Sequence, residues 1–414
     1  MDIILTMIIQ RPGETGKINS IRKWLLVYGR RKTGKSFLVE NFATYDDYFF
    51  VKRDRSVISK KDSALLSYET FLEVLKRGIA DGKTIVVDEF HRLGDDFLDF
   101  LHASKKQGKL ILISSTLFLS KKLLSAHSPI LGLFAEVPVW LIDMKDSIRV
   151  LHKLALEKKS MVELAILLKE PVVVDYFDET KPPRHTFGTV VSSSSNMVPA
   201  LVGEIFIEEE RGMSAVYEGI LRAIANGNVV SSEISSYLFA RTLVQKDDPS
   251  TIQQYLNNLV EFGIIKKLQV YGKNRFIYKH TSPLVRLFYY ADEKYNISEK
   301  MLNDLEIDRI IGELLPKIVE DCVREFLATR FGLGEAILEA KDYDVDGCLM
   351  KFNKCEIALE VKWKEKIGKD DVQRAEEVLH KITAKRRLLF VPDKKKINFK
   401  PADIEIVDIS DFIQ

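Results

Sequence analysis

Short apolar runs alternate with amphipathic stretches over the first third of the chain. The apolar runs are WLLVY (24–28), YFFV (48–51), TIVV (84–87), LILI (110–113) and VPVWLI (137–142), and the stretches between them include SFLVENFA (36–43) and SYETFLEVLKRGIA (67–80). Runs of this length are typical of buried strands, and their alternation with helical periodicity predicts a parallel sheet with helices on both faces. We therefore expect an α/β core over residues 1–145.

The following segment, residues 146–212, has a helical and then an irregular pattern. Residues 146–168 have helical periodicity, whereas Pro182, Pro183 and Gly188 predict a loop. The serine run Ser192–Ser195 continues this irregular stretch. We interpret the segment as a helical lid on the core.

Residues 213–295 contain three helical segments and two alternating runs. The helical segments are 214–227, 231–239 and 249–265, and the alternating runs on either side of the GKN turn (272–274) predict a β-hairpin. Three helices followed by a hairpin predict a winged helix-turn-helix.

Residues 296–414 begin with a helical bridge and continue as a further α/β unit. The bridge covers residues 298–331, and the strands are expected at YDVDGCLMKF (343–352), EIALEVKWK (356–364) and RRLLFV (386–391). A length of 414 residues suits such a division, because single cores stop growing near 250 to 300 residues.

Composition narrows the class of protein. With 46% hydrophobic and 29% charged residues the chain should fold, and its net charge of +2 gives no global attraction for nucleic acid. Residues 351–400 are an exception, because this segment contains 15 lysines and arginines but eight acids. This local excess suits either a polyanionic partner or a solvated basic surface.

The three cysteines and the apolar segments predict a cytoplasmic location. Cys322, Cys348 and Cys355 have neither paired CxxC spacing nor a histidine cluster, so neither a disulfide framework nor a zinc site is expected. The apolar start carries Asp2 and reaches Arg11 too soon to be a secretion signal or a membrane span. No later apolar run of about 18 residues is expected, so we expect no contact with a membrane.

The segment GRRKTGKS (29–36) fills every position of the GxxxxGK[ST] phosphate-binding pattern, between an apolar strand and a helix. Gly29 and Gly34 let the backbone amides face the phosphates, Lys35 reaches the β and γ oxygens, and Ser36 offers a hydroxyl to Mg²⁺. The sequence thus predicts ATP and Mg²⁺ as cofactors. The candidate nucleotide-binding residues are Gly29, Arg30, Arg31, Lys32, Thr33, Gly34, Lys35, Ser36, Phe37, Asp88 and Ser115.

Two acids at the end of a later strand complete this candidate site. Thr84–Val87 runs into Asp88 and Glu89, a Walker B pattern expected to lie beside the loop. There Asp88 would hold the magnesium and Glu89 would orient the attacking water. The run LILISST ends in hydroxyl side chains, of which Ser115 is the candidate sensor of the γ-phosphate.

The chain resembles the archaeal ATPases of the STAND and AAA+ superfamily. The resemblance rests on VYGRRKTGKS, VVDEF, SSTLFLSKKLLSAHSPILG and EEERGMSAVYEGILRAIANGN. It implies a nucleotide-dependent switch or motor with a helical lid, and in many members a C-terminal nuclease-like domain. Where the family often has an arginine after SPxxG, this chain has Leu133, so the γ-phosphate arginine is missing or is supplied by Arg30 or Arg31.

The third helix of the predicted winged helix has a polar face. Gln253, Gln254, Asn257 and Asn258 could read adenine edges in a major groove, and Lys266, Lys267, Lys273 and Arg275 surround the wing. Glu261 and the scarcity of basic residues on the helix oppose strong phosphate binding. DNA contact and a protein-binding role are both left open.

In EIALEVKWK, strand alternation places Glu360 and Lys362 on one face. A carboxylate beside an ammonium can hold Mg²⁺ and position a water for phosphodiester attack. With Glu320 and Asp346 upstream, the order resembles PD-(D/E)xK nucleases. The resemblance implies metal ligation by Glu320, Asp346 and Glu360 and water orientation by Lys362. Asp344 is an alternative to Asp346, and Gln373 lies on the following helix.

The sequence therefore predicts an α/β P-loop NTPase core of AAA+ type, a helical lid, a winged helix-turn-helix and an α/β restriction-endonuclease-like domain, over 1–145, 146–212, 213–295 and 296–414. Lys35 and Glu89 would act in ATP hydrolysis, and Glu360 and Lys362 in Mg-dependent DNA cleavage. Ser36 and Asp88 would hold the first metal. The partners expected are ATP and DNA, with a homo-oligomer open. The alternative is a STAND-like switch that binds nucleotide and a partner without cutting.

Overall fold

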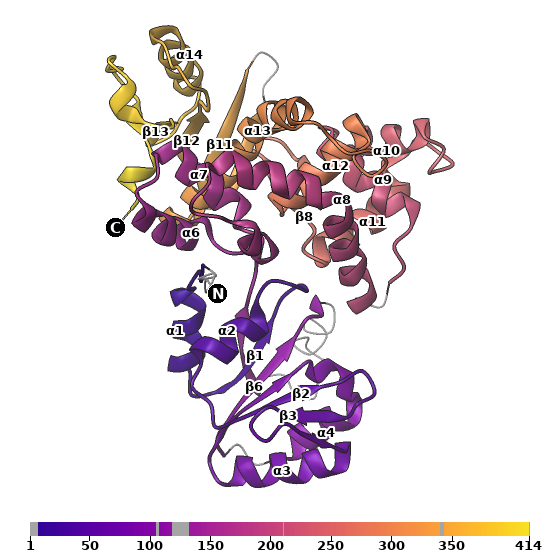
Figure 1. Cartoon of the computed structure of the whole chain (residues 1–414). Helices are drawn as coiled ribbons and strands as arrows, with labels where there is room; N and C mark the ends of the chain where they lie inside the picture. Colours follow the sequence, from indigo (N-terminus) through magenta and orange to yellow (C-terminus); the bar gives the residue numbers. More distant parts are fainter. Residues whose placement is uncertain (1–6, 105–106, 118–131, 210, 340–342, 414) are drawn as a thin grey trace.

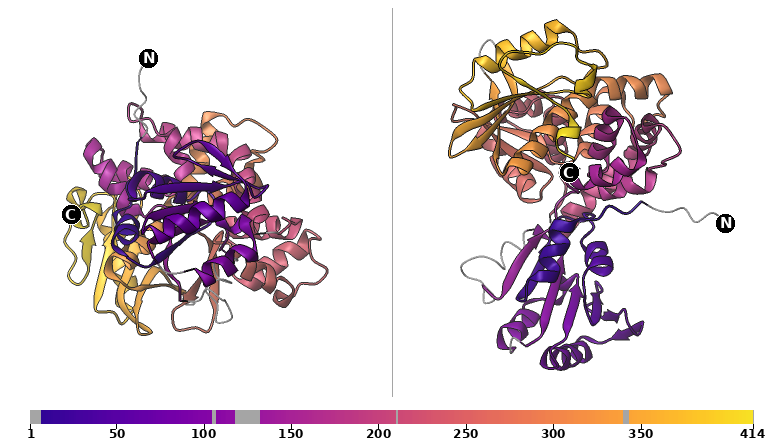
Figure 2. Two further views of the ribbon diagram at one scale, coloured as in Figure 1. Left: turned by 90° about the horizontal axis from the view of Figure 1, so that it is seen from below. Right: turned by 90° about the vertical axis from the view of Figure 1, so that its left-hand side faces the viewer.

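The computed structural model describes residues 7–104, 107–117, 132–209, 211–339 and 343–413. The chain forms two lobes that meet at a narrow waist (Figures 1 and 2). The lower lobe holds the elements up to β7, and the upper lobe holds everything from α6 onward. The predicted SPxxG segment and the first six residues lie outside the described residues.

The lower lobe is built on one seven-stranded sheet, ordered β4-β3-β2-β5-β6-β1-β7, in which the last five strands of that order are parallel. The strands are β1 (Trp24–Tyr28), β2 (Asp47–Val51), β3 (Val57–Ser59), β4 (Ala64–Leu66), β5 (Thr84–Asp88), β6 (Lys109–Ser114) and β7 (Phe134–Pro138). The predicted α/β core is therefore present. The acid-bearing strand β5 does not pair with β1, because β6 lies between them.

Alternating side chains of the lower sheet supply two apolar cores. Leu25 and Val27 pack with helices α1 and α2 on one face, and Trp24 and Leu26 pack with α3 and α4 on the other. The helices are α1 (Pro12–Ser20), α2 (Lys35–Phe42), α3 (Tyr68–Ala80) and α4 (Asp95–Ala103). The parallel strands end at one edge, where ligands of α/β sheets usually bind.

The upper lobe begins with three helices that pack against its C-terminal half. These are α6 (Met144–Leu151), α7 (Lys158–Leu167) and α8 (Pro183–Glu208), all of which contact α13 (Asp304–Phe331). The prediction of an irregular stretch through Ser192–Ser195 is wrong, because this run lies inside α8. Burial of Phe187, Val190 and Val198 outweighs the low helix propensity of the serines, and Ser194 donates its hydroxyl proton to the carbonyl of Val191.

Helix α8 is, among the described helices, the one long and apolar enough to cross a bilayer, with a mean hydropathy of 1.3 over its most apolar window. The expectation that no such stretch exists is therefore wrong. Within the upper lobe α8 packs against α12 (Pro283–Tyr295), α13 and α7, as a core helix does.

Three helices and a hairpin follow α8. They are α9 (Ala215–Ala225), α10 (Ser231–Ala240), α11 (Pro249–Glu261), β8 (Ile265–Val270) and β9 (Phe276–His280). The hairpin does not stand alone. Strand β8 pairs in parallel with β10 (Gly334–Glu339), so the hairpin forms one edge of the C-terminal sheet.

The C-terminal sheet has the order β14-β13-β12-β11-β10-β8-β9. Its further elements are β11 (Asp344–Lys351), β12 (Lys354–Val361), α14 (Lys369–His380), β13 (Arg386–Phe390) and β14 (Glu405–Val407). Helix α13 covers one face, where Leu359 and Phe390 are buried, and α14 covers the other, where Ala358 and Leu389 are buried. Residues 213–295 and 296–414 therefore share one sheet.

Candidate functional site

The turn between β1 and α2 has the backbone that its glycines predict. Gly34 has a φ of +85°, which favours glycine, and Lys32 has a φ of +65°. A Cβ on Gly29 would lie 2.1 Å from the carbonyl oxygen of Val139, so any side chain there collides with the neighbouring backbone. The Thr33 hydroxyl donates to the carbonyl of Arg30 at 3.0 Å. These features shape a concave backbone segment at the start of α2.

Lys35 begins α2 and points back into this turn. Its ammonium donates to the carbonyl of Arg30 at 2.9 Å and is almost fully buried. Burial lowers the pKa of Lys35 to about 8, although Glu89 and Asp88 act in the opposite direction. A buried ammonium in this position can bind an anion.

The two candidate magnesium ligands of the lower lobe both lie near the Tyr48 hydroxyl. This hydroxyl donates to Asp88 Oδ2 at 2.8 Å, and Ser36 lies near enough to influence the pKa of Tyr48. Burial, together with the charge of Asp88, raises the pKa of Tyr48. Strand β6 separates β5 from β1, yet Asp88 and Ser36 are brought together, because both lie at the carboxyl edge of the sheet.

Glu89 follows Asp88 with a φ of +58° and is largely buried. Its Oε2 atom accepts a hydrogen bond from Ser115 at 3.1 Å and lies 3.0 Å from Arg92 and 3.4 Å from His91. The strand-end hydroxyl and the strand-end acid predicted from the sequence are therefore in direct contact.

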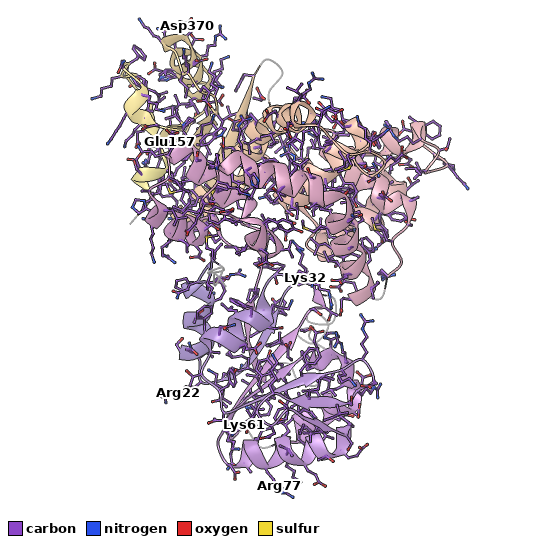
Figure 3. All side chains as sticks on the ribbon, viewed as in Figure 1. Arg22, Lys32, Lys61, Arg77, Glu157 and Asp370 are labelled. Atoms are coloured by element: carbon purple, nitrogen blue, oxygen red, sulfur yellow. The ribbon has the colours of Figure 1, made fainter. Side chains whose placement is uncertain are left out.

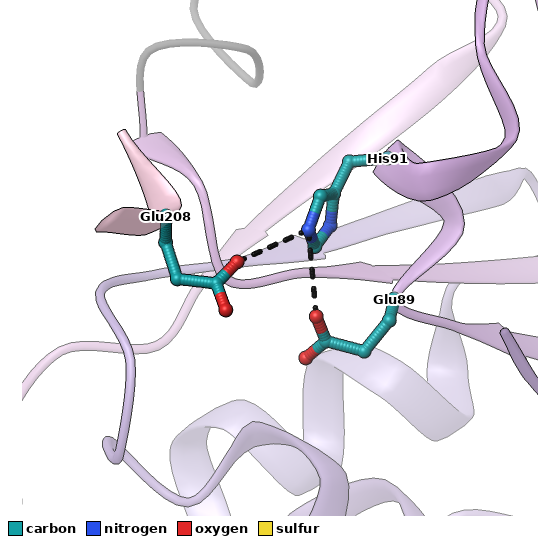
Figure 4. A group of neighbouring side chains, drawn as sticks. All are labelled: Glu89, His91 and Glu208. Carbon is teal, nitrogen blue, oxygen red and sulfur yellow. Dashed lines mark hydrogen bonds and ion pairs between the residues drawn. The ribbon is translucent and has the colours of Figure 1, made fainter. Parts of the chain in front are cut away.

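A carboxylate from the upper lobe enters the same cluster. Glu208, the last residue of α8, accepts a hydrogen bond from Ser115 at 3.2 Å, and its Oε2 lies 3.2 Å from His91 Nε2 (Figure 4). Its other oxygen lies 2.5 Å from Arg31. The hydrogen bond with His91, together with the charges of His91 and Arg31, lowers the pKa of Glu208 to about 2. Ligand atoms of Glu89, His91 and Glu208 all lie within 4.8 Å of one another.

The two arginines of the loop are both engaged by acids of the upper lobe. Arg30 forms an ion pair with Glu170 in which both side chains are buried. Arg31 contacts Glu204 and Glu208. Lys32, by contrast, is exposed at the waist (Figure 3). Arg30 is the first candidate for the missing γ-phosphate cation, but its guanidinium is paired with Glu170. Arg31 is the better candidate, because it contacts Glu208, an acid of the site.

An apolar pocket opens beside the phosphate-binding turn. It has a volume of about 420 Å³ and is lined by residues of the N-terminal segment, α2 and the start of the upper lobe, among them Ile9, Gly34, Phe37, Ile142 and Pro171. Phe37 is 48% exposed, and Asp175 supplies a carboxylate to the lining. The size and lining suit a planar heterocycle attached to a phosphate chain.

A second group of acids lies in the upper lobe. Glu320 is on α13, Asp346 is on β11, and Glu360 and Lys362 are at the end of β12. Lys362 lies 2.5 Å from Glu360, and Asp346 Oδ2 accepts the backbone N–H of Val361 at 2.8 Å. The other oxygen of Glu360 is buried without a hydrogen-bond partner. Gln373 on α14 is exposed.

The pKa of each carboxyl in this second group is raised, in each case first by burial. Burial raises the pKa of Glu320 to about 7, with further contributions from Asp321 and Glu360. Burial, Glu320 and Glu360 raise the pKa of Asp346 well above its usual range. Burial also raises the pKa of Glu360, although Lys362 opposes it. Such mutual repulsion, with one buried oxygen unsatisfied, suits a divalent cation.

The polar residues of α11 are used within the protein. Asn258 is buried and donates to the Tyr217 hydroxyl at 2.6 Å, so the expectation that it lies on an open polar face is wrong. Around the hairpin, Lys266 contacts Glu325 and Glu335, and Arg275 contacts Glu339. Lys267 and Lys273 remain exposed.

Sequence reasoning missed several contributors to the first site. Glu170, Glu204 and Glu208 come from the upper lobe, more than a hundred residues away from the loop that they contact. In the sequence, nothing distinguishes Tyr48 from any other aromatic residue in a predicted strand. His91 and Arg92 follow the acid pair after a single residue, Phe90, and this proximity was the one local signal for them.

Residues 21–131 match the family model described as an AAA domain. Among solved structures, the chain is similar to the Walker-type ATPase PABY2304 of Pyrococcus abyssi, at 20% identity, with 68% of this chain and 96% of that chain covered and a TM-score of 0.50. It also matches the ORC2 protein of Aeropyrum pernix in ADPNP-ADP complexes (11% identity, 72% and 90% covered, TM-score 0.36) and the ORC1 protein of the same organism in complex with DNA (12%, 72% and 96%, 0.33).

No curated protein matches the sequence. The family model and the fold likeness assign an AAA-type P-loop domain with a parallel sheet to the lower lobe.

Proposed function

We propose that the chain binds Mg-ATP at the β1–α2 turn and hydrolyses it. The observation that carries this proposal is the convergence of three features at one sheet edge. They are the turn defined by Gly29 and Gly34, the buried ammonium of Lys35 and the acid pair Asp88–Glu89. The adjacent apolar pocket has room for an adenine base.

Each residue has a physical role in this reaction. The amides of the turn and the ammonium of Lys35 neutralise phosphate oxygens, and Ser36 and Asp88 would hold the magnesium ion. Bound magnesium supplies further neutralisation of the charge that develops on the phosphates. Glu89 orients the attacking water, and Ser115 positions Glu89 through their hydrogen bond.

Calorimetric titration of Mg-ATP into wild-type protein, Lys35→Ala and Arg77→Ala tests the proposal. Lys35→Ala should weaken binding at least about tenfold and stop phosphate release, because a charge-assisted contact is lost. The control Arg77→Ala should bind and turn over normally, since this side chain is exposed on α3 and outside the phosphate-binding turn. Absence of heat with folded wild-type protein would refute the proposal.

We further propose that Glu320, Asp346 and Glu360 hold a divalent cation for phosphodiester cleavage, with Lys362 orienting the water. Support comes from the raised carboxyl pKa values of these buried acids and from the unpartnered buried oxygen of Glu360. The excess of basic residues in 351–400 favours a polyanionic substrate such as DNA. Residues 215–280 have the element order of a winged helix, but only Lys267 and Lys273 of the predicted basic wing lie exposed, so they contribute little to this attraction.

Incubation with single-stranded, duplex and branched DNA in Mg²⁺ or Mn²⁺ tests this second activity. Wild-type protein should cut at least one substrate, and Glu360→Gln should cut none while still hydrolysing ATP. Uncut DNA under every condition would leave the alternative of a nucleotide-dependent switch without nuclease activity.

A further inference from the structure

The C-terminal end of α8 carries acidic side chains, which the dipole of the helix disfavours. Glu204, Glu208 and Glu209 lie in its last turn or at its cap, where no basic residue is present. Carboxylates at a helix C-terminus meet the negative end of the helix dipole. Their stabilisation therefore has to come from elsewhere, and local rules broken in this way often mark functional sites.

The compensating charges belong to the proposed nucleotide site. Glu208 is 9% exposed and contacts Arg31 of the phosphate-binding turn, His91 and Ser115, and Arg92 lies 3.9 Å away. Glu209 accepts the backbone N–H of Leu117, just beyond the strand-end hydroxyls. Figure 4 shows the carboxylates of Glu208 and Glu89 both reaching the same nitrogen, Nε2, of His91. Two carboxylates, one from each lobe, thus share one set of donors.

We propose that Arg31, His91, Arg92 and Ser115 form the subsite for the terminal phosphate of ATP, and that Glu208 occupies it until a nucleoside triphosphate displaces it. This inference rests on the proposed function. It supplies the positive charge that Leu133 fails to provide. A phosphate oxygen needs the same donors that Glu208 uses, so both anions cannot hold them together.

Displacement breaks the ion pairs that Glu208, at the end of α8, forms with Arg31 and His91 of the lower lobe. ADP, which lacks the terminal phosphate, leaves Glu208 in place. The subsite therefore distinguishes ATP from ADP and couples that distinction to the position of α8.

The test compares Mg-bound ATP analogue, one that resists hydrolysis, with Mg-ADP on wild-type protein, Glu208→Gln and Glu204→Gln. Glutamine keeps the shape but removes the competing charge, so Glu208→Gln should bind the triphosphate about tenfold tighter and change ADP affinity less than about twofold. Glu204→Gln is the matched control. Its partner is also Arg31, but Glu204 is 40% exposed, and this ion pair involves neither His91 nor Ser115.

Hydrogen exchange in wild-type protein gives a second measurement that needs no variant. The triphosphate analogue should raise exchange in residues 202–208, and ADP should not. If nucleotides bind but Glu208→Gln shifts both affinities equally, or if exchange in this segment ignores the triphosphate, the subsite assignment is refuted and the ATP site stands. If no nucleotide binds at all, the proposed function fails and this inference fails with it.

Discussion

The two acid-rich sites of this chain lie in different lobes and satisfy their charges in opposite ways. In the lower lobe, Glu89 meets Arg92, and Glu208 meets Arg31 and His91. In the upper lobe, Glu320, Asp346 and Glu360 crowd together. Lys362 contacts Glu360, and the charges of Lys279 and Arg286 act on Glu320. The pKa of Glu208 is accordingly lowered, whereas the pKa of each of these three upper-lobe acids is raised.

This difference indicates what each site needs from a ligand. An anion that enters the lower site has to replace protein carboxylates, so binding there moves parts of the protein. A cation that binds in the upper site relieves the repulsion between its carboxylates, and this binding requires no movement of the protein. Buried carboxylates with too little positive charge around them are costly to ionise, and a bound metal ion removes that cost.

Loss of the upper-site lysine should have the largest effect. Lys362→Ala should slow DNA cleavage by about 10² to 10⁴-fold, as expected for a positioned catalytic group, and leave ATP turnover intact. Parallel assays of cleavage and phosphate release measure both. Equal losses in the two assays would mean that the sites do not work separately.

The buried pair at the loop should govern stability. Glu170→Ala leaves Arg30 buried without its partner and should cost about 3 to 5 kcal/mol in the free energy of unfolding. Glu204→Gln, which breaks a partly exposed pair, should cost less than about 1 kcal/mol. Urea denaturation compares the two variants, and similar costs would contradict the distinction.

The upper site should bind metal in a pH-dependent way. The pKa of Glu320 is raised to about 7 from its ordinary value of 4.5, so this group contributes a loss of stability as the pH rises between those values. A divalent cation favours the charged form. Mn²⁺ should therefore raise the Tm at pH 8 by at least about 3 °C more than at pH 5.

Thermal scans with Mn²⁺ or with EDTA measure this difference, and Glu320→Gln should abolish most of it. A metal effect of the same size at both pH values would argue against a site made of these acids.

The smallest expected effect concerns protons at the lower site. Because burial lowers the pKa of Lys35 to about 8, a fraction of this group is neutral at pH 8.5. A bound triphosphate favours the ammonium, so Mg-ATP binding should take up as much as about one proton at pH 8.5 and almost none at pH 6.5. Calorimetry in buffers of different ionisation enthalpy measures this uptake, which the exposed-residue control Arg77→Ala should retain.

The elements that sequence reasoning predicted well are those encoded locally. The loop motif lies within eight residues, and its glycines specify the observed turn. Four of the five predicted apolar runs coincide with β1, β2, β5 and β6, whose side chains are buried on both faces of the sheet. Strand β7 lies at 134–138 instead of 137–142, and β3 and β4 were not predicted. Helix α8 was not predicted, since prolines and serines dominate its first half locally and only tertiary burial makes the segment helical.

Contacts between the lobes could not be predicted from the sequence. Nothing local distinguishes Glu208 from other surface acids, and its role depends on a fold that brings α8 to the end of β6. The buried state of Asn258 depends in the same way on Tyr217, which lies 41 positions away. The sequence shows which charged and polar residues are present, but which of them contact one another depends on the folded structure.

The pairing of β8 with β10 has a consequence for how the chain divides. A fragment that stopped at residue 295 would carry a hairpin with a bare edge strand, and such edges recruit other strands and aggregate. The parts of the chain on either side of position 296 should accordingly unfold together, because β8 and β10 belong to one sheet.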